Sequence, residues 1–164
     1  MLIVPTPARL RAAGLKVTAP RLAVLDALEQ AGAHPDVERI AEVARERHGS
    51  LSLRTVYENL RVLADAGLAR RFEPAGSPAR FEARVGDNHH HLVCRSCGTA
   101  VDVDCVVGAR PCLEPSDDAG FALDEAEVTF WGVCPACQSD QKRQDDQQRD
   151  HQEPTNLDEH RSTA

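Results

Sequence analysis

The sequence is poor in aromatic residues, which make up 4% of its 164 positions and include a single Trp and a single Tyr. Aliphatic side chains, and bound metal if there is any, must therefore supply most of the stability. The opening stretch MLIVPTPARLRAAG has a four-residue apolar run that ends at Pro5, too short for a secretory signal, and no stretch approaches membrane-spanning length. We therefore expect a cytoplasmic protein, whose six cysteines are metal ligands or reduced thiols rather than three disulfides.

The net charge of −7 is unevenly distributed. Residues 1–84 carry a net charge of +3, and residues 85–164 carry −10. A basic front and an acidic back favour two domains with different partners. The last segment, 138–164, has one aliphatic residue, Leu157, and no aromatic one, so it cannot bury enough surface to offset the entropy lost on ordering. We predict a disordered polar tail there.

The first half of the chain carries start signals for three helices in quick succession. Thr18 is followed by Ala-Pro, and proline is tolerated in the first turn of a helix, while Asp36 and Ser52 are typical capping residues. Apolar residues at helical spacing follow each start, and the third helix is expected to end near Gly67. The next stretch, LARRFEPAGSPARFEAR, predicts two short strands around a Pro/Gly/Ser loop.

Three helices followed by a hairpin are the order of a winged helix-turn-helix, in which the helix from Ser52 would enter the major groove of DNA. We expect base and phosphate contacts from the start of that helix and from two basic residues upstream, namely Ser52, Arg54, Thr55, Tyr57, Lys16 and Arg21. Hairpin arginines would hold phosphates: Arg70, Arg71, Arg80 and Arg84. The alternative is an ordinary solvated helix and surface hairpin, because such units also serve as protein contacts.

Four of the cysteines form two Cys-x-x-Cys pairs, Cys94 with Cys97 and Cys134 with Cys137. Each pair can direct two thiolates at one ion, and together they would complete a tetrahedral S4 site, which favours zinc. Since 36 residues separate the pairs, the ion would join two distant elements of one domain. A thioredoxin-like redox pair, which lacks its expected helix setting here, and two local disulfides, which need an oxidising compartment, are the alternatives.

Three consecutive histidines, at positions 89–91, indicate a second metal site. If they begin a strand, His89 and His91 lie on one face and His90 on the other. In the following TAVDVDC, Asp102 and Asp104 alternate with apolar residues in the same way. Two imidazoles and a carboxylate make a mixed N/O set suited to Fe, Mn, Zn or Ni. A histidine cluster that is merely solvated or packed is the alternative.

Five stretches, in order, resemble the ferric uptake regulator (Fur) family of metal-dependent repressors over residues 7–138: LKVTAPRLAVLDAL, SLRTVYENLRVLADAGL, RFE, DNHHHLVCRSCG and WGVCPAC. The closest likeness is to actinobacterial members that repress a catalase-peroxidase gene and behave like the peroxide-sensing (PerR-like) branch. The resemblance implies an α+β fold, with a winged-helix DNA-binding domain at 1–84, an α/β dimerisation domain at 85–137 and the polar tail at 138–164. It also implies a homodimer that binds palindromic double-stranded DNA operators when loaded with metal.

Carried over residue by residue, the resemblance places a structural Zn²⁺ on Cys94, Cys97, Cys134 and Cys137. It places a regulatory Fe²⁺, with Mn²⁺ or another divalent ion as alternatives, on His34, Glu82, His89, His91 and Asp102. These ligands come from both domains, so the ion would fix the angle between them and select the DNA-binding conformation. Peroxide-sensing members commonly have aspartate where Glu82 stands, and one extra residue separates Phe81 from His89 in this sequence.

The resemblance therefore implies a repressor, not an enzyme, that releases DNA when peroxide oxidises a ligating histidine, His34 or His89. An iron or other metal uptake regulator without peroxide sensing is one alternative, and a thiol switch between Cys105 and Cys112 is another. A zinc hydrolase or deaminase is a third and more remote alternative. Its H-x-E motif would have to be residues 151–153, which follow the second cysteine pair, and four cysteines leave no position for water.

Overall fold

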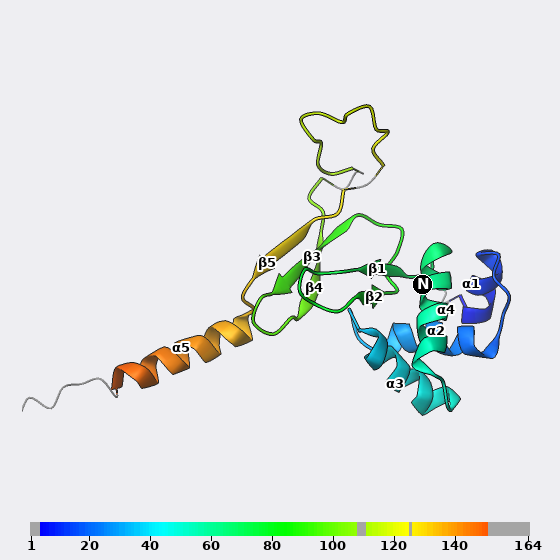
Figure 1. Ribbon diagram of the computed structural model, residues 1–164, viewed down its shortest axis with the longest axis horizontal. Coiled ribbons are helices and arrows are strands. Elements are labelled where there is room, and N and C mark those ends of the chain that lie inside the picture. Colours follow the sequence, from blue (N-terminus) through cyan, green and yellow to red (C-terminus); the bar gives the residue numbers. More distant parts are fainter. Residues whose placement is uncertain (1–3, 108–110, 125, 151–164) are drawn as a thin grey trace, which may run out of the picture.

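The computed structural model describes residues 4–107, 111–124 and 126–150, which form a helical N-terminal domain and a C-terminal domain built on a sheet (Figure 1). The N-terminal domain consists of α1 (Thr6–Ala12), α2 (Ala19–Gln30), α3 (Val37–His48), α4 (Leu53–Asp65), β1 (Arg70–Phe72) and β2 (Arg80–Glu82). The predicted helices and hairpin are confirmed, and α1, which the sequence analysis did not include, precedes them. Every helix in these ranges is too short or too polar to cross a membrane.

The predicted start and stop signals of the helices are found in place. Thr18 precedes α2 in an extended conformation, although its side chain makes no capping hydrogen bond. The Asp36 carboxylate and the Ser52 hydroxyl each accept the backbone N–H three residues further along, at 2.8 and 3.0 Å. Gly67, just after α4, has a φ of +68°, the left-handed conformation that ends many helices.

An aliphatic core holds the N-terminal domain together. It draws fully buried side chains from all four helices, among them Leu10, Leu25, Ile40 and Leu60. Each such side chain contributes about 1.5–3 kcal/mol on burial. Phe81 of β2 joins this core, and its backbone N–H donates to a carbonyl in the α2–α3 turn at 3.0 Å. The hairpin is thus fastened to the helices at one of its two strands.

The C-terminal domain is a three-stranded sheet of order β4-β3-β5, formed by β3 (His89–Cys94), β4 (Ala100–Asp104) and β5 (Thr129–Gly132). β4 runs antiparallel and β5 parallel to the central strand. A parallel pair needs a long connection. The described residues between β4 and β5 extend from the sheet as a loop (Figure 1). The buried apolar cluster is small, with Phe72, Val93 and Ala100, and Trp131 packs against it.

Strand β3 alternates as predicted. His89 pairs with Asp104 and His91 with Asp102, so these four side chains lie on one face of the sheet and that of His90 lies on the other. The first face is turned toward the hairpin, because the ring of Phe72 in β1 stacks on that of His91 with centroids 3.9 Å apart. The two domains therefore meet where the histidines lie.

The last described element, α5 (Pro135–Asp150), projects away from the sheet on the side opposite the N-terminal helices (Figure 1). The prediction of a disordered tail from residue 138 differs from the structure, in which residues 138–150 continue this helix. The second Cys-x-x-Cys pair forms the first turn of α5, with Pro135 at the start. Forming a first turn is the costly nucleation step of a helix, and here the cysteine turn provides it. Residues 151–164, which carry the H-x-E sequence, lie outside the described residues.

Candidate metal centres

Two tight turns bring the sulfur atoms of both Cys-x-x-Cys pairs together. The first turn joins Cys94, at the end of β3, to Cys97, and Gly98 adopts a φ of +72° there while its N–H donates to the Cys94 carbonyl at 2.9 Å. The second carries Cys134 and Cys137 into the start of α5. All four Sγ atoms lie within 4.8 Å of one another.

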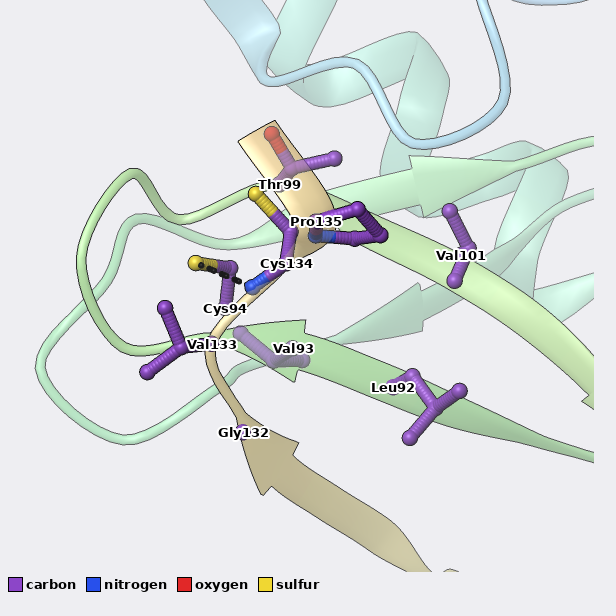
Figure 2. A pocket seen from close by; sticks show the side chains of 9 residues that line it. All are labelled: Leu92, Val93, Cys94, Thr99, Val101, Gly132, Val133, Cys134 and Pro135. Atoms are coloured by element: carbon purple, nitrogen blue, oxygen red, sulfur yellow. Dashed lines mark hydrogen bonds between the residues drawn. The ribbon is translucent and has the colours of Figure 1, made fainter. Parts of the chain in front are cut away.

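The spacing of these sulfur atoms suits a tetrahedral zinc ion. Cys97 Sγ and Cys134 Sγ are 3.7 Å apart, near the roughly 3.8 Å expected for two thiolates on one zinc at about 2.3 Å. Figure 2 shows Cys94 beside Cys134, whose backbone N–H donates to Cys94 Sγ at 3.3 Å. Neither a redox pair nor two local disulfides would require both pairs to converge on one point. The arrangement fits an S4 zinc site.

The electrostatics of the four thiols also favour a cation among them. Hydrogen bonds from the backbone N–H groups of Cys134 and Cys97 lower the pKa of Cys94 to about 6, and the Thr99 hydroxyl lowers the pKa of Cys97. In contrast, the sulfur atoms of Cys134 and Cys97 raise the pKa of Cys137 to about 12. Four neighbouring thiolates repel one another, so they ionise together only when a positive ion lies between them.

A second group of ligands lies between the two domains. His34 comes from the turn between α2 and α3 and Glu82 from the end of β2, while His91 and Asp102 come from β3 and β4. One ligand atom from each lies within 4.8 Å of the others. His89 adjoins the group, with Nε2 3.0 Å from Glu82 Oε1. The structure thus brings together all five residues on which the resemblance places the regulatory ion.

The ligand atoms of this group lie close together, but some of them lack a hydrogen-bond partner in the part of the chain that the structure describes. Glu82 Oε2 is 3.2 Å from both His34 Nε2 and His91 Nε2, and Asp102 Oδ1 is 2.6 Å from His34 Nε2. Despite that closeness, neither His34 Nε2 nor Asp102 Oδ1 forms a properly directed hydrogen bond within the described residues. Buried polar atoms normally have partners, and an ion among them would be a partner for all. The donor set fits a cation with mixed N/O ligation.

The remote ring nitrogens of two of these histidines are held by separate acceptors. His34 Nδ1 lies 3.1 Å from the carbonyl oxygen of Ala100, and His89 Nδ1 lies 2.9 Å from Asp87 Oδ1. An Nδ1–H that donates to such an oxygen leaves the lone pair on Nε2, facing the centre. These acceptors therefore hold both rings in an orientation that directs Nε2 at the centre.

Burial alone would raise the pKa of Glu82, but the adjacent imidazoles of His34 and His91 and the charges of His89 and His91 lower the pKa to about 2. Burial would lower the pKa of His34, but the adjacent carboxylates of Glu82 and Asp102 outweigh it and raise that pKa. The two carboxylates thus favour the protonated form of His34 when no metal is bound. A metal ion that binds there must displace the proton.

The two cysteines outside the pairs, Cys105 and Cys112, form a third group together with His90. Cys112 Sγ lies 3.3 Å from His90 Nε2. Burial and the neighbouring Cys105 raise the pKa of Cys112, so its thiol is mostly protonated at neutral pH and a weak nucleophile toward peroxide. The sequence analysis gave His90 no role and did not connect it with Cys105 or Cys112.

The predicted DNA contacts on α4 gather at its N-terminal end. Arg54 and Tyr57 are exposed, and Arg54 Nε donates to Glu58 Oε1 at 2.8 Å one turn further on. The hydroxyls of Ser52 and Thr55 lie 2.8 Å apart, and that of Ser52 also caps the helix. The start of α4 thus presents side chains that can contact DNA, with Ser52 serving first to begin the helix.

Two further predicted contacts lie close together upstream of α4, since Arg21 Nη1 donates to the Lys16 carbonyl at 2.7 Å. On the hairpin, Arg71 is exposed and pairs with Glu73. Arg70 is four-fifths buried, with Nε 3.9 Å from Glu82 Oε1. Of the two hairpin arginines, Arg71 is thus open to solvent, whereas Arg70 faces the second ligand group.

The remaining hairpin arginines correct the sequence analysis, which expected them to hold phosphates. Arg80 donates to the carbonyls of His34 and Gly98, at 3.0 Å each. Arg84 pairs with Asp104 at 2.7 Å and reaches two other aspartates beside it. Both guanidinium groups therefore join the hairpin to the C-terminal domain. Residue type alone could not distinguish them from Arg71, because the destination of each side chain depends on how the domains dock.

The model of the Ferric uptake regulator family matches residues 12–130. The chain belongs to this family. Over 129 residues it is 55% identical to Transcriptional regulator FurA of Mycobacterium tuberculosis, an alignment that covers 79% of this chain and 87% of that protein. It is 31% identical to the Peroxide-responsive repressor PerR of Staphylococcus aureus, over 80% of this chain and 88% of the other.

Solved structures agree with this membership. The ferric uptake regulator from Pseudomonas aeruginosa with manganese superposes with a TM-score of 0.65 at 30% identity, over 81% of this chain and 99% of that one. The predicted α+β fold, a winged helix followed by an α/β domain, is confirmed. This Fur-family protein is a metal-dependent transcriptional regulator that binds DNA, and it is not an enzyme.

Proposed function

We propose that this Fur-family protein is a dimeric repressor that holds operator DNA when a divalent ion, Fe²⁺ in the cell, joins its two domains, and releases it on exposure to peroxide. The observation that carries the proposal is the group of ligands between the domains. His34 and Glu82 of one domain meet His91 and Asp102 of the other within 4.8 Å. Since an ion bound by all four favours one angle between the domains, metal binding selects one conformation.

The four paired cysteines, Cys94, Cys97, Cys134 and Cys137, are assigned to a structural Zn²⁺. Four sulfur ligands fill a tetrahedral shell, which leaves no position for water and suits a structural role. The ion would tie the end of β3 to the start of α5. The apolar cluster of this domain is small, so zinc would replace the burial that the sheet lacks.

The regulatory ion is assigned to His34, Glu82, His89, His91 and Asp102. Their nitrogen and oxygen atoms suit Fe²⁺ or Mn²⁺ rather than a thiophilic ion. Fe²⁺ held by these residues would activate hydrogen peroxide for cleavage of its O–O bond. One oxygen atom of the peroxide would be added to the imidazole of His34 or His89, a net two-electron oxidation of the ring, and the other would leave as water. The modified ring no longer ligates, so the domains come apart.

Sensing of this kind suits control of peroxide-defence genes, a catalase-peroxidase gene among them. Similarity to a peroxide-responsive repressor over most of the chain supports this assignment. So does the raised pKa of Cys112, which argues against a thiol as the first target. A metal uptake regulator without peroxide sensing is the second candidate, because Glu82 stands where peroxide-sensing members commonly have aspartate.

We assign the DNA contacts to the start of α4 and to the basic residues before it: Ser52, Arg54, Thr55, Tyr57, Lys16 and Arg21. A palindromic operator needs two such domains. An exposed apolar stripe supports a homodimer through the sheet, since Leu92 in β3 pairs with Val101 in β4 and Phe130 in β5, and all three side chains are exposed. Stripes of this kind mark protein contacts.

The first test measures operator binding by fluorescence anisotropy during anaerobic Fe²⁺ or Mn²⁺ titration of the zinc-loaded protein. Glu82→Gln should lower metal-dependent operator affinity about 100-fold, because it removes the carboxylate at the centre of the site. Glu73→Gln, an exposed glutamate of the same hairpin, is the matched control and should behave as wild type. Equal behaviour of the two variants would contradict the assignment of the regulatory site.

The second test exposes the iron-loaded and manganese-loaded proteins to a small dose of peroxide. Operator release is expected only with iron, and mass spectrometry should find one added oxygen on His34 or His89. Oxygen found on cysteine alone would point to a thiol switch. Operator binding that survives peroxide with both metals would leave the metal uptake regulator as the function.

A further inference from the structure

His90, Cys105 and Cys112 form a cluster that neither proposed metal centre uses. His90 lies between two regulatory ligands in sequence, but alternation along β3 turns it to the opposite face of the sheet. Cys105 follows β4, and its backbone N–H donates to the Asn88 carbonyl at 3.2 Å, which holds it level with the start of β3. Cys112 reaches the same place from the β4–β5 loop.

The three side chains present their ligand atoms to one another. One atom from each lies within 4.8 Å of the others, and Cys112 Sγ is 3.3 Å from His90 Nε2. Two ligands on a tetrahedral zinc ion, bound at about 2.1 and 2.3 Å, are roughly 3.6 Å apart. The cluster therefore needs little rearrangement to close around an ion of that size.

His90 itself lacks the partners that a buried imidazole requires. Only 7% of its surface is exposed, and its Nδ1 has no hydrogen-bond partner within the described residues. The contact of its Nε2 is with a thiol, which is a weak hydrogen-bonding group. A metal ion bonded to the ring nitrogen would compensate its desolvation far better than the sulfur contact does.

A pocket of about 400 Å³ opens beside the cluster and gives an ion a way in. His90, Cys105 and Cys112 form part of its wall, and Val107, Leu113 and Phe130 supply apolar surface around them. Three protein ligands beside an open space leave room for a fourth ligand from solvent or another molecule. The paired-cysteine centre, in contrast, completes its own shell.

We propose that His90, Cys105 and Cys112 form a third metal site, which binds a thiophilic ion such as the divalent Zn²⁺. Two sulfur atoms and one imidazole select soft or borderline ions, unlike the N/O centre between the domains. Binding replaces the thiol protons of Cys105 and Cys112 by bonds to the ion, and both protons are released to solvent. The ion ties the β4–β5 loop to the sheet, on the face away from the DNA-binding domain.

The test counts metal in the full-length, reduced, zinc-loaded protein after anaerobic dialysis against Zn²⁺. The wild type should hold one more equivalent per chain than Cys105→Ser/Cys112→Ser. His90→Asn should lose the same equivalent, or bind it at least tenfold more weakly. His48→Asn is the matched control, because it removes a half-exposed histidine of α3, and it should keep the wild-type count.

Co²⁺ provides a second readout that reports sulfur ligation directly. Thiolate-to-cobalt charge-transfer absorption should appear in the wild type at the first added equivalent, without release of zinc, and be absent from the double cysteine variant. Glu82→Gln removes the interdomain centre and should keep this absorption, so failure of the regulatory assignment and failure of the third site are distinguishable. Retained circular dichroism and S4 zinc in each variant exclude unfolding as the cause of a loss.

Equal metal counts and equal cobalt spectra for the wild type and the double variant would overturn the proposal. The proposal would also be overturned if mass spectrometry found a Cys105–Cys112 disulfide that survives in a reducing buffer and prevents metal uptake. That second result would make the two cysteines a redox pair instead.

Discussion

The two domains are stabilised by different means. The N-terminal domain buries aliphatic side chains from four helices in one core. The described part of the C-terminal domain has a small apolar cluster, and one of its members, Phe72, comes from the hairpin. In place of a core, the C-terminal sheet has ligand groups at its end and on both faces. Burial makes the first domain stable whatever ions are present. Ligation makes the second responsive to them.

The boundary between the domains differs from both interiors. Arg80 bridges the carbonyl of His34 in the N-terminal domain and that of Gly98 in the C-terminal domain, and Arg84 pairs with a carboxylate of the C-terminal domain. Glu82 meets the histidines between the domains. Such polar contacts are directional and exchange readily with water, so they contribute less to stability than a packed core but can form and break. If the proposed ion binds there, we expect the junction to open when the ion is lost, while each domain stays folded.

The largest expected effect is that of Cys94→Ser. On the order of 10 kcal/mol of binding free energy links a structural zinc to folding, so the C-terminal domain should unfold while the N-terminal domain keeps its helices. Nuclear magnetic resonance of backbone amides would separate the two domains residue by residue. Cys112→Ser, which removes a thiol from the same domain, should leave the sheet folded. If Cys94→Ser left the sheet intact, zinc would not be its main support.

The converse change is Leu60→Ala in α4. Leu60 is fully buried, and its truncation should lower the free energy of unfolding of the N-terminal domain by about 2–5 kcal/mol. The zinc content of the protein should not change. Thermal unfolding combined with metal analysis measures both, and Leu53→Ala, at an exposed position of the same helix, is the control. Loss of zinc in Leu60→Ala would show that the domains fold as one unit.

A smaller effect is expected at the junction, from Arg80→Gln. Hydrogen bonds to a charged donor contribute about 1.5–3 kcal/mol. This guanidinium makes two, one to the His34 carbonyl of its own domain and one to the Gly98 carbonyl across the domain boundary. The affinity for the regulatory ion should fall about tenfold or more, with both domains still folded. Metal competition with a fluorescent chelator measures it. Arg71→Gln, on the exposed side of the same hairpin, should have no effect on metal affinity.

The smallest predicted effect is the pH dependence of regulatory metal binding. The pKa of His34 is raised above its usual 6.5, so the metal-free centre holds a proton at and somewhat above that pH. Metal displaces the proton, and the apparent affinity should therefore rise with pH through this window, by about tenfold per unit. Glu82, whose pKa is lowered to about 2, stays ionised throughout and adds nothing to the slope. Chelator competition at pH values on either side of 7 checks this, and a flat profile would contradict it.

Local sequence signals predicted much of the fold. Capping at Asp36 and Ser52, the helix end at Gly67 and the alternation of β3 all act between residues a few positions apart, so the sequence is sufficient to locate them. The sequence analysis did not predict α1 because this helix is seven residues long and has no side-chain cap. Residues 138–150 escaped because their composition is that of a solvated tail, and a helix there depends on the cysteine turn that begins it.

The candidate centres were predictable to different degrees. Two Cys-x-x-Cys pairs are themselves the signal of an S4 site, and alternation placed His89 with His91 on one face of the first strand and Asp102 with Asp104 on one face of the second. His34 and Glu82 lie on elements far from these strands in sequence, and the family resemblance, not periodicity, identified them. The third group was missed because Cys112 reaches His90 from a loop whose path no local pattern describes.

The sequence by itself determined which residues could begin helices, alternate along strands or turn two thiols toward one ion, since each of these depends on neighbours within a few positions. The tertiary structure decided which arginines stay exposed to solvent and which join the domains, and that His90 meets two cysteines behind the sheet. These outcomes depend on how the hairpin docks on the sheet and where the long loop returns. Docking of that kind results from contacts between residues far apart in the chain, which no short stretch encodes.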